Sequence, residues 1–294
     1  MTPSFRKLAL TCPTVLTAAV LFAACGGDDA TIGSPDPGNE RPAAAGLEHV
    51  HGLGINPRDD ALIIATHTGL FRAGKSETRA RAYGDSRQDV MGFSILGPDR
   101  FIGSGHPDPR DTSSPPNLGL IRSRDGGRSF EPVSLRGEAD FHVLESRGEQ
   151  VYGFDGTQAR LMVSRDGGRR WTQRTPPAAM LALAIDPTDG ARIVAATAAG
   201  LRSSSDEGRT WKPLAPALIG LLAWPGAERL YLLDGAGGVQ LSTDRGRSFR
   251  SVGSVGGQPA AFMASGDELY AALHDGTVKR SADGGRTWQV RATP

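Results

Sequence analysis

Ser281-Ala282-Asp283-Gly284-Gly285-Arg286-Thr287-Trp288 is the last of five copies of one short pattern in this chain of 294 residues. Each copy places an aspartate two residues after a serine, a glycine two residues further on, and a tryptophan or phenylalanine three residues after that glycine. The aspartates are Asp125, Asp166, Asp206, Asp244 and Asp283, and the intervals between them are 41, 40, 38 and 39 residues. This nearly constant spacing indicates a repeat architecture in which each repeat is one structural unit.

The residue types in each copy predict a tight turn between two strands. Short serine and aspartate side chains bond to backbone N–H groups within their own turn, and glycines adopt the positive φ angles that a hairpin reversal needs. The aromatic residue then begins the next strand as a large apolar anchor. We call these five segments the aspartate turns. We interpret them as structural, because five evenly spaced copies are hard to explain as five active sites.

Three further apolar stretches precede each aspartate turn, which gives four short strands in about 40 residues, the size of one β-propeller blade. The predicted blades start at His49, Met91, Phe141, Met180, Ile219 and Ala261. We therefore predict an all-β fold, a six-bladed β-propeller over residues 46–294. The second blade carries an insertion from Gly105 to Asn117, and a loop of this length is typical of a face that is used for function.

The aspartate turns resemble the Asp-box, or BNR, repeat of sialidases and of many propellers that are not sialidases. The resemblance covers most of the chain after about residue 46. It implies that the turns lie on the face of the propeller away from the catalytic centre. The stretches that contain His49, His67, Met91 and His106 also resemble bacterial lipoproteins described as glycosyl-hydrolase-like or sialidase-like. We treat that description as a statement of fold, since one fold hosts many functions.

The first 45 residues have the features of an export signal and a tether. Arg6 and Lys7 precede an apolar run that is too short and too interrupted for a membrane span. The run ends in Leu21-Phe22-Ala23-Ala24-Cys25, which resembles a bacterial lipobox and implies removal of a signal peptide, residues 1–24, and lipid attachment to Cys25. Ordinary signal cleavage nearby is the alternative. Residues 25–45, the lipidated cysteine and a Gly- and Pro-rich linker, would tether the domain to the outer face of a bacterial membrane.

Charge and cysteine content indicate which partners the protein can bind and how its fold is stabilised. The formal net charge is +1 and the charges are interspersed, so we expect no nucleic-acid partner. The only other cysteine, Cys12, lies within the predicted signal peptide. The mature domain would therefore have no disulfide, and its stability must come from a large buried core.

Strand order predicts that all six histidines lie on one face, because the start of a first strand and the end of a second strand lie opposite the aspartate turn. These histidines, with Arg110 as a candidate anion ligand on the same face, are His49, His51, His67, His106, His142 and His274. His49 and His51 are two residues apart in one strand, so we expect them to point to the same side. Imidazoles and a thioether suit copper or zinc. The predicted metal ligands are His49, His51, His67, Met91, His106 and His142.

Other uses of this face stay open on the sequence. The histidines could be the hydrogen-bonded lining of a polar channel, or could bind a small polar molecule or a glycan. Asp108 and Asp140 are the candidates for the acid or base of a glycoside hydrolase. An enzyme is not the favoured interpretation, because the Arg-Ile-Pro signature that sialidases carry is missing and no arginine triad is recognisable. Tyr152, Tyr231 and Tyr270 recur at one repeat position, which is typical of packing rather than of a nucleophile.

The sequence thus predicts an exported lipoprotein, anchored through Cys25, whose propeller binds a ligand at a His-rich channel mouth. The ligand is a transition metal ion or a small polar or glycan molecule. The alternatives are a glycoside hydrolase of the sialidase-like superfamily and a scaffold for assembly with a protein partner at the cell surface.

Overall fold

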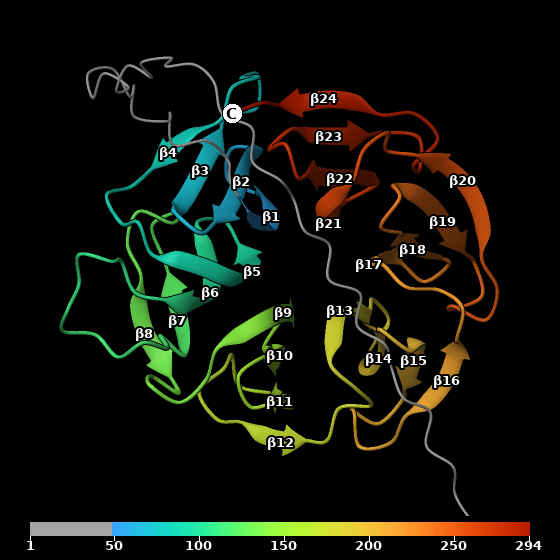
Figure 1. The fold of residues 1–294 in the computed structure, drawn as a ribbon, viewed down its shortest axis with the longest axis horizontal. Helices are drawn as coiled ribbons and strands as arrows, with labels where there is room; N and C mark the ends of the chain where they lie inside the picture. Colours follow the sequence, from blue (N-terminus) through green and yellow to red (C-terminus); the bar gives the residue numbers. More distant parts are fainter. Residues whose placement is uncertain (1–48) are drawn as a thin grey trace, which may run out of the picture. The chain divides into compact units, whose positions relative to one another are not determined.

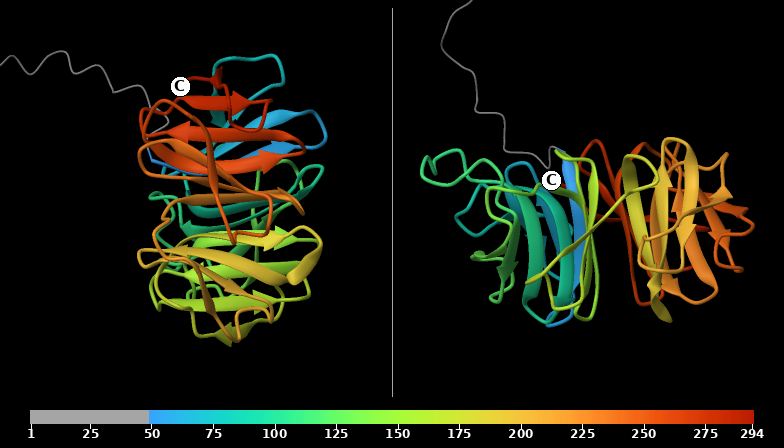
Figure 2. Two further views of the ribbon diagram at one scale, coloured as in Figure 1. Left: turned by 90° about the vertical axis from the view of Figure 1, so that its right-hand side faces the viewer. Right: turned by 90° about the horizontal axis from the view of Figure 1, so that it is seen from below.

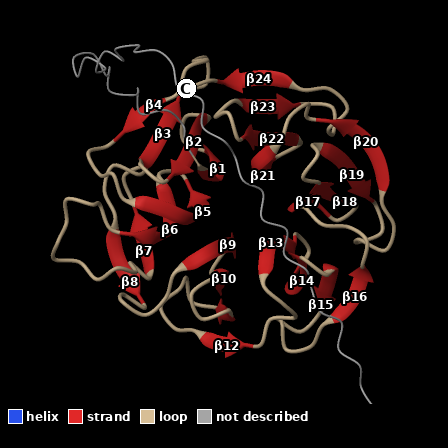
Figure 3. Cartoon of the chain, viewed as in Figure 1, coloured by secondary structure: helices blue, strands red, loops and turns tan. Residues whose placement is uncertain are grey.

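The computed structural model describes residues 49–294 (Figure 1). The predicted signal peptide, Cys25 and the linker lie outside the described residues. Within the described part the chain forms strands, turns and loops and no helix (Figure 3). Accordingly, residues 49–294 contain no helix that could cross a membrane.

Six antiparallel sheets of four strands each form a ring, which confirms the predicted six-bladed propeller. The strands of blades 1 to 3 are β1 (Val50–Asn56), β2 (Ala61–Thr66), β3 (Gly69–Ala73), β4 (Arg81–Tyr83), β5 (Asp89–Gly97), β6 (Arg100–His106), β7 (Leu120–Ser123), β8 (Glu131–Ser134), β9 (Phe141–Arg147), β10 (Gln150–Asp155), β11 (Arg160–Ser164) and β12 (Thr172–Arg174). Those of blades 4 to 6 are β13 (Met180–Asp186), β14 (Asp189–Thr197), β15 (Gly200–Ser204), β16 (Lys212–Ala215), β17 (Leu221–Gly226), β18 (Arg229–Leu233), β19 (Gly238–Ser242), β20 (Arg250–Ser254), β21 (Pro259–Ser265), β22 (Glu268–Leu273), β23 (Val278–Ser281) and β24 (Gln289–Ala292). Every first strand begins within two residues of its predicted start.

The core consists of apolar layers between neighbouring blades. β2 is buried along its whole length, and the other second strands are buried over most of theirs, because each is covered by a blade on both sides. Tyr152 and Leu161 of blade 3, for example, pack against Leu183 and Ile193 of blade 4. Burial between blades explains how the ring is held together without a disulfide.

The aspartate turns join the third and fourth strands of blades 2 to 6, as predicted. In the last one, Ser281 Oγ accepts a hydrogen bond from the Gly285 N–H at 2.8 Å and donates to Asp283 Oδ1 at 2.8 Å. Asp283 also accepts bonds from the backbone N–H and the hydroxyl of Thr287. These bonds lower the pKa of Asp283 to about 2. The carboxylate is therefore part of the turn and is not free for chemistry.

Strands run from one face of the ring to the other (Figure 2). We call the face with the five aspartate turns the turn face. The opposite face, where the first strands begin and the second strands end, is the mouth face.

The ring closes between blades 1 and 6, and each of these blades is complete in itself. Leu62, Ile64 and Phe71 of blade 1 share an apolar cluster with Tyr270 and Val278 of blade 6. At the rim, the Ala80 N–H donates to the Thr293 carbonyl at 2.8 Å, and the Thr293 N–H donates to the Thr78 carbonyl at 2.9 Å. Closure therefore rests on packing, on this short bridge and on hydrogen bonds from the Arg291 guanidinium to the Glu77 and Gly74 carbonyls. Within residues 49–294 no strand is exchanged between blades.

Candidate functional site: the channel mouth

A β-bulge at the start of the first strand shapes the mouth in five of the six blades. The pairing of first and second strands shifts register by one residue there, as between Val50 and Gly52 of β1. Such a bulge bends the strand and changes where the extra side chain points. The bulged residues, all of which line the channel mouth, are His51, Met91, His142, Leu181 and Ala260. One backbone position thus supplies two of the histidines and the methionine.

The first strands of all six blades enclose a cavity of about 280 Å³ at the mouth. Deeper in the channel its wall is mainly apolar, with Leu183, Leu222 and Phe262. Glu145 of β9 is the one carboxylate among the lining residues of this cavity, and it also lines a second cavity of about 280 Å³ that contains residues nearer the turn face. Burial raises the pKa of Glu145 to about 8.

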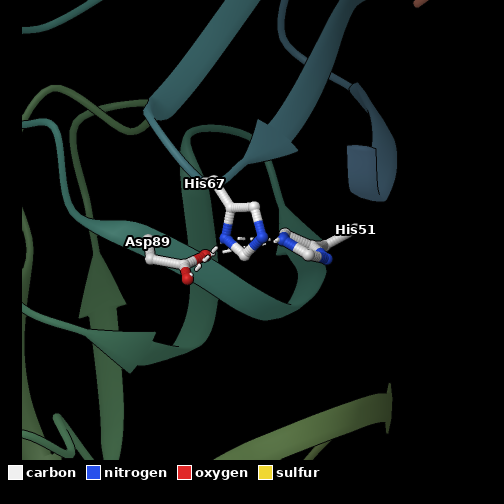
Figure 4. Close-up of side chains that lie close together, drawn as sticks. All are labelled: His51, His67 and Asp89. Carbon is white, nitrogen blue, oxygen red and sulfur yellow. Dashed lines mark hydrogen bonds and ion pairs between the residues drawn. The ribbon is translucent and has the colours of Figure 1, made fainter. Parts of the chain in front are cut away.

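Three potential metal ligands converge where blades 1 and 2 meet (Figure 4). His67 Nδ1 lies 3.2 Å from His51 Nε2 and 2.6 Å from Asp89 Oδ2. His51 Nε2 lies 3.5 Å from Asp89 Oδ1. His51 comes from the bulge of β1, His67 follows β2, and Asp89 begins β5. The His49 ring is also near, 5.0 Å from that of His67 between centroids.

The electrostatics of this group favour a bound cation over a protonated imidazole. Burial lowers the pKa of His51 to about 4; Asp89 opposes this shift, while the other nearby histidines add to it. His51 is therefore neutral near pH 7 and keeps a lone pair for a metal. Oδ1 of Asp89 is buried and has no hydrogen-bond partner among residues 49–294. An unpaired carboxylate oxygen beside neutral imidazoles suits a divalent metal ion.

A second His and Asp cluster lies one blade further on. Asp140, directly before β9, places Oδ2 at 2.8 Å from His142 Nε2 and 3.5 Å from His106 Nε2. The Pro116 carbonyl in the insertion lies 2.8 Å from His106 Nδ1, which leaves Nε2 directed at Asp140. His106 and Asp140 repeat the positions of His67 and Asp89. The hydrogen bond to Asp140 raises the pKa of His142. The second cluster therefore stabilises a protonated imidazole, whereas burial in the first cluster keeps His51 neutral.

Other predicted site residues lie apart from the two clusters. Asp108 accepts bonds from the Arg110 side chain, at 2.9 Å to Nε, and from the Arg87 N–H at 2.8 Å. These bonds hold the pKa of Asp108 well below its usual range. Arg110 Nη2 also donates to the carbonyl of Asp85, in the loop before β5, so the guanidinium ties the insertion to that loop. The His274 side chain is exposed and makes no hydrogen bond in the described part of the chain.

Sequence reasoning missed two carboxylates. It also gave strand alternation as the reason for His49 and His51 to share a side, whereas a bulge interrupts the alternation and His49 precedes β1 with a φ of 53°. The two rings nevertheless lie on one side, with centroids 5.0 and 4.4 Å from that of His67. Asp89 was missed, although it stands at the same repeat position as Asp140. Glu145 was missed as well. The sequence indicates it by placing an acidic residue directly after Val143 and Leu144 in the first strand of blade 3.

No protein-family model matches the sequence, and no curated protein matches it. Solved structures do resemble it. A GH74 enzyme of Niastella koreensis is 14% identical with a TM-score of 0.59, and the match covers 84% of this chain and 46% of that one. A chain of a nidogen/laminin complex is 14% identical with a TM-score of 0.61, over 80% and 93% of the chains. YCF48 bound to a D1 peptide is 16% identical with a TM-score of 0.52, over 84% and 82%.

These likenesses show the β-propeller fold and include glycoside hydrolases among the structural neighbours. The chain spans 39% to 46% of the length of the GH74 chains it matches. At such low identity the likeness concerns fold alone.

Proposed function

We propose that this protein binds a divalent transition metal ion, zinc in the first place, at the channel mouth through His51, His67 and Asp89. The observation that carries the proposal is the convergence of their ligand atoms, which all lie within 4.8 Å of one another. Nitrogen and oxygen ligands of this kind suit Zn²⁺, and Cu²⁺ is the competitor that the same ligands admit.

The separations between ligand atoms agree with a tetrahedral site. Bonds of about 2.0 to 2.2 Å to zinc put neighbouring ligands about 3.3 to 3.6 Å apart in a tetrahedral site. His51 Nε2 lies 3.2 Å from His67 Nδ1 and 3.5 Å from Asp89 Oδ1. The 2.6 Å contact between His67 Nδ1 and Asp89 is a hydrogen bond, which the metal would replace by taking the proton's place on the imidazole.

Three protein ligands leave the fourth position of a tetrahedral site for water or a small ligand. That position would adjoin the cavity of about 280 Å³, so a small polar molecule bound there could reach the metal. We place this site on an exported lipoprotein anchored through Cys25, as the first 45 residues predict.

The test measures zinc binding to the purified chain by calorimetry, after chelation, for wild type, His67→Ala and His274→Ala. His274 directly follows the second strand of blade 6, as His67 follows that of blade 1. Its side chain is exposed and belongs to no group of potential ligands among residues 49–294, so it is the matched control. We expect one zinc ion per chain, at least about tenfold weaker in His67→Ala and unchanged in His274→Ala. No binding to wild type, or equal loss in both variants, would contradict the proposal. The same titration with Cu²⁺ decides the preferred metal.

A glycoside hydrolase is the second candidate, and the GH74 neighbours favour it. Its acid or base would be Asp140 rather than Asp108, because Asp108 is held ionised by Arg110. Release of reducing sugar from glycan polymers that is lost in Asp140→Asn would support it. The nidogen/laminin and D1-peptide structures support a scaffold in the same limited way, as propellers that assemble with a protein or peptide.

A further inference from the structure

A groove on the turn face, between blades 4 and 5, gathers positive charge. It has a volume of about 270 Å³ and is lined by β14 to β17 and by the aspartate turn of blade 5. Four cationic side chains line it, Arg192, Lys212, Arg245 and Arg247, and no carboxylate belongs to its lining. Hydroxyl groups of serines 203 to 205 and of Thr210 complete its polar wall.

Neighbouring acids compensate only part of this charge. The buried carboxylate of Asp186 lies 3.3 Å from Arg245 Nε and 3.5 Å from Arg192 Nε. Asp189 reaches Arg192 at 3.9 Å. Lys212 and Arg247 are exposed and form no ion pair with any residue between 49 and 294. Two cations thus face the groove without a counterion.

The equivalent groove between blades 3 and 4 is also lined by four cationic side chains, Arg165, Arg170, Arg174 and Arg209, but it differs at one position by carrying a buried carboxylate. It has a volume of about 250 Å³ and contains Glu207, which stands three residues after Ser204. Glu207 makes two bonds with Arg165, at 2.7 and 2.5 Å, and lies 3.5 Å from Arg209. In the next repeat the corresponding residue, three after Ser242, is Arg245. The charge at this one position is therefore reversed from acidic to basic. Arg245 has only the Asp186 carboxylate, which it shares with Arg192, and no acid belongs to the groove lining itself.

Backbone conformation and one unpaired donor add to the argument. The position of Arg245 has positive φ in every aspartate turn; three turns place glycine there, whereas Arg245 adopts 61° and Glu207 adopts 59°. A residue other than glycine in this left-handed conformation costs free energy, and such conformations are found mainly at functional sites. Trp224 lines the groove, is 8% exposed, and its indole N–H has no partner among the described residues. A buried donor without a partner calls for an explanation, and a bound ion or water is one of the few that are known.

We propose that this groove binds a doubly charged oxyanion group, phosphate or sulfate, carried by a small molecule. Arginine donors match the oxygens of such groups in geometry and in charge. The volume of about 270 Å³ leaves room for the molecule that bears the group. The site lies on the face opposite the metal ligands, so it is independent of the proposed metal site.

The experiment titrates inorganic phosphate, inorganic sulfate and phenyl phosphate into the purified chain by calorimetry in the presence of EDTA. Arg245→Gly removes a central cation and gives the backbone the residue that three other turns use, so we expect it to fold. Glu207→Gly makes the same backbone change in the groove between blades 3 and 4 and removes no cation, so it is the matched control for loss of affinity. Melting curves check that both variants are folded.

We expect saturable binding of at least one of the three probes, weakened at least about tenfold in Arg245→Gly and within twofold of wild type in Glu207→Gly. Binding should also weaken as sodium chloride is added. The preference between phosphate and sulfate then assigns the group. The proposal is wrong if no probe binds saturably, or if Glu207→Gly loses affinity as much as Arg245→Gly.

Discussion

Glu145 makes the stability of the propeller depend on pH in a way that one substitution removes. Its carboxyl group lies in the channel among Leu183, Leu222 and Phe262, where burial raises its pKa from 4.5 to about 8. Between these two values the folded protein keeps the proton and the unfolded chain releases it. The free energy of unfolding therefore falls as pH rises from 4.5 to 8 and is level above that window.

The size of the effect follows from the shift. One pKa unit corresponds to about 1.4 kcal/mol, so the full shift is worth about 5 kcal/mol. The side chain is only half buried, and water in the channel stabilises the carboxylate, so we expect a loss of about 2 to 3 kcal/mol. Glu145→Gln keeps the shape of the side chain and removes the charge. Its stability should match that of wild type near pH 5 and exceed it by that amount at pH 8.5.

Urea denaturation followed by circular dichroism, at both pH values and in EDTA, measures the difference. Glu149→Gln, an exposed change in the same blade, is the control and should follow the wild-type pH dependence. The reasoning would be refuted if Glu145→Gln and wild type lost stability in parallel between pH 5 and pH 8.5. In that case the carboxylate is already ionised in the folded channel.

Three further predictions concern the fold. Ser281→Ala should lower the free energy of unfolding by about 1 to 2 kcal/mol in urea titrations, because the buried Gly285 N–H loses its acceptor; an unchanged midpoint would contradict this. Gly92→Ala should cost at least about 2 kcal/mol, because a Cβ there would meet the Phe141 carbonyl and Leu144, whereas Gly235→Ala, with open space around it, should change stability little. Acid should destabilise the domain below about pH 4, because Asp206, Asp244 and Asp283 have pKa values of about 2 in the folded protein and 3.8 in the unfolded chain. Between these values the unfolded chain binds more protons, so the free energy of unfolding falls as pH falls. A melting temperature that stays constant down to pH 2 would oppose this account.

The fold was predictable because one local rule recurs. The hydrogen bonds made by Ser281 and Asp283 lie within a single turn, so they can be predicted from the residue types of that turn. The period of the repeat then gives the number of blades. The shared face of the histidines was predictable for the same reason, since strand direction alone decides it. The prediction went no further than the face, because strand order says nothing of distances across the ring.

The details of the mouth depend on contacts between blades, which a single repeat does not reveal. Asp89 belongs to blade 2 but completes a group whose imidazoles come from blade 1. The bulges that direct His51, Met91 and His142 leave no distinct residue signature. The groove around Arg245 escaped notice because Arg245 and Arg247 lie in an aspartate turn, which we interpret as structural, and because Arg192 and Lys212 come from the neighbouring blade.

The closure between blades 1 and 6, made by packing and a few hydrogen bonds without an exchanged strand, determines where the ring opens most easily. A ring without an exchanged strand has a seam, and local opening there costs only the contacts of that one boundary. The His51, His67 and Asp89 group spans blades 1 and 2, which are consecutive in the chain and lie on the other side of blade 1 from the seam. A fluctuation that parts blade 6 from blade 1 would widen the channel while leaving these three ligands together. Opening at this seam would therefore let a molecule enter the channel while the proposed metal ion stays bound at the mouth.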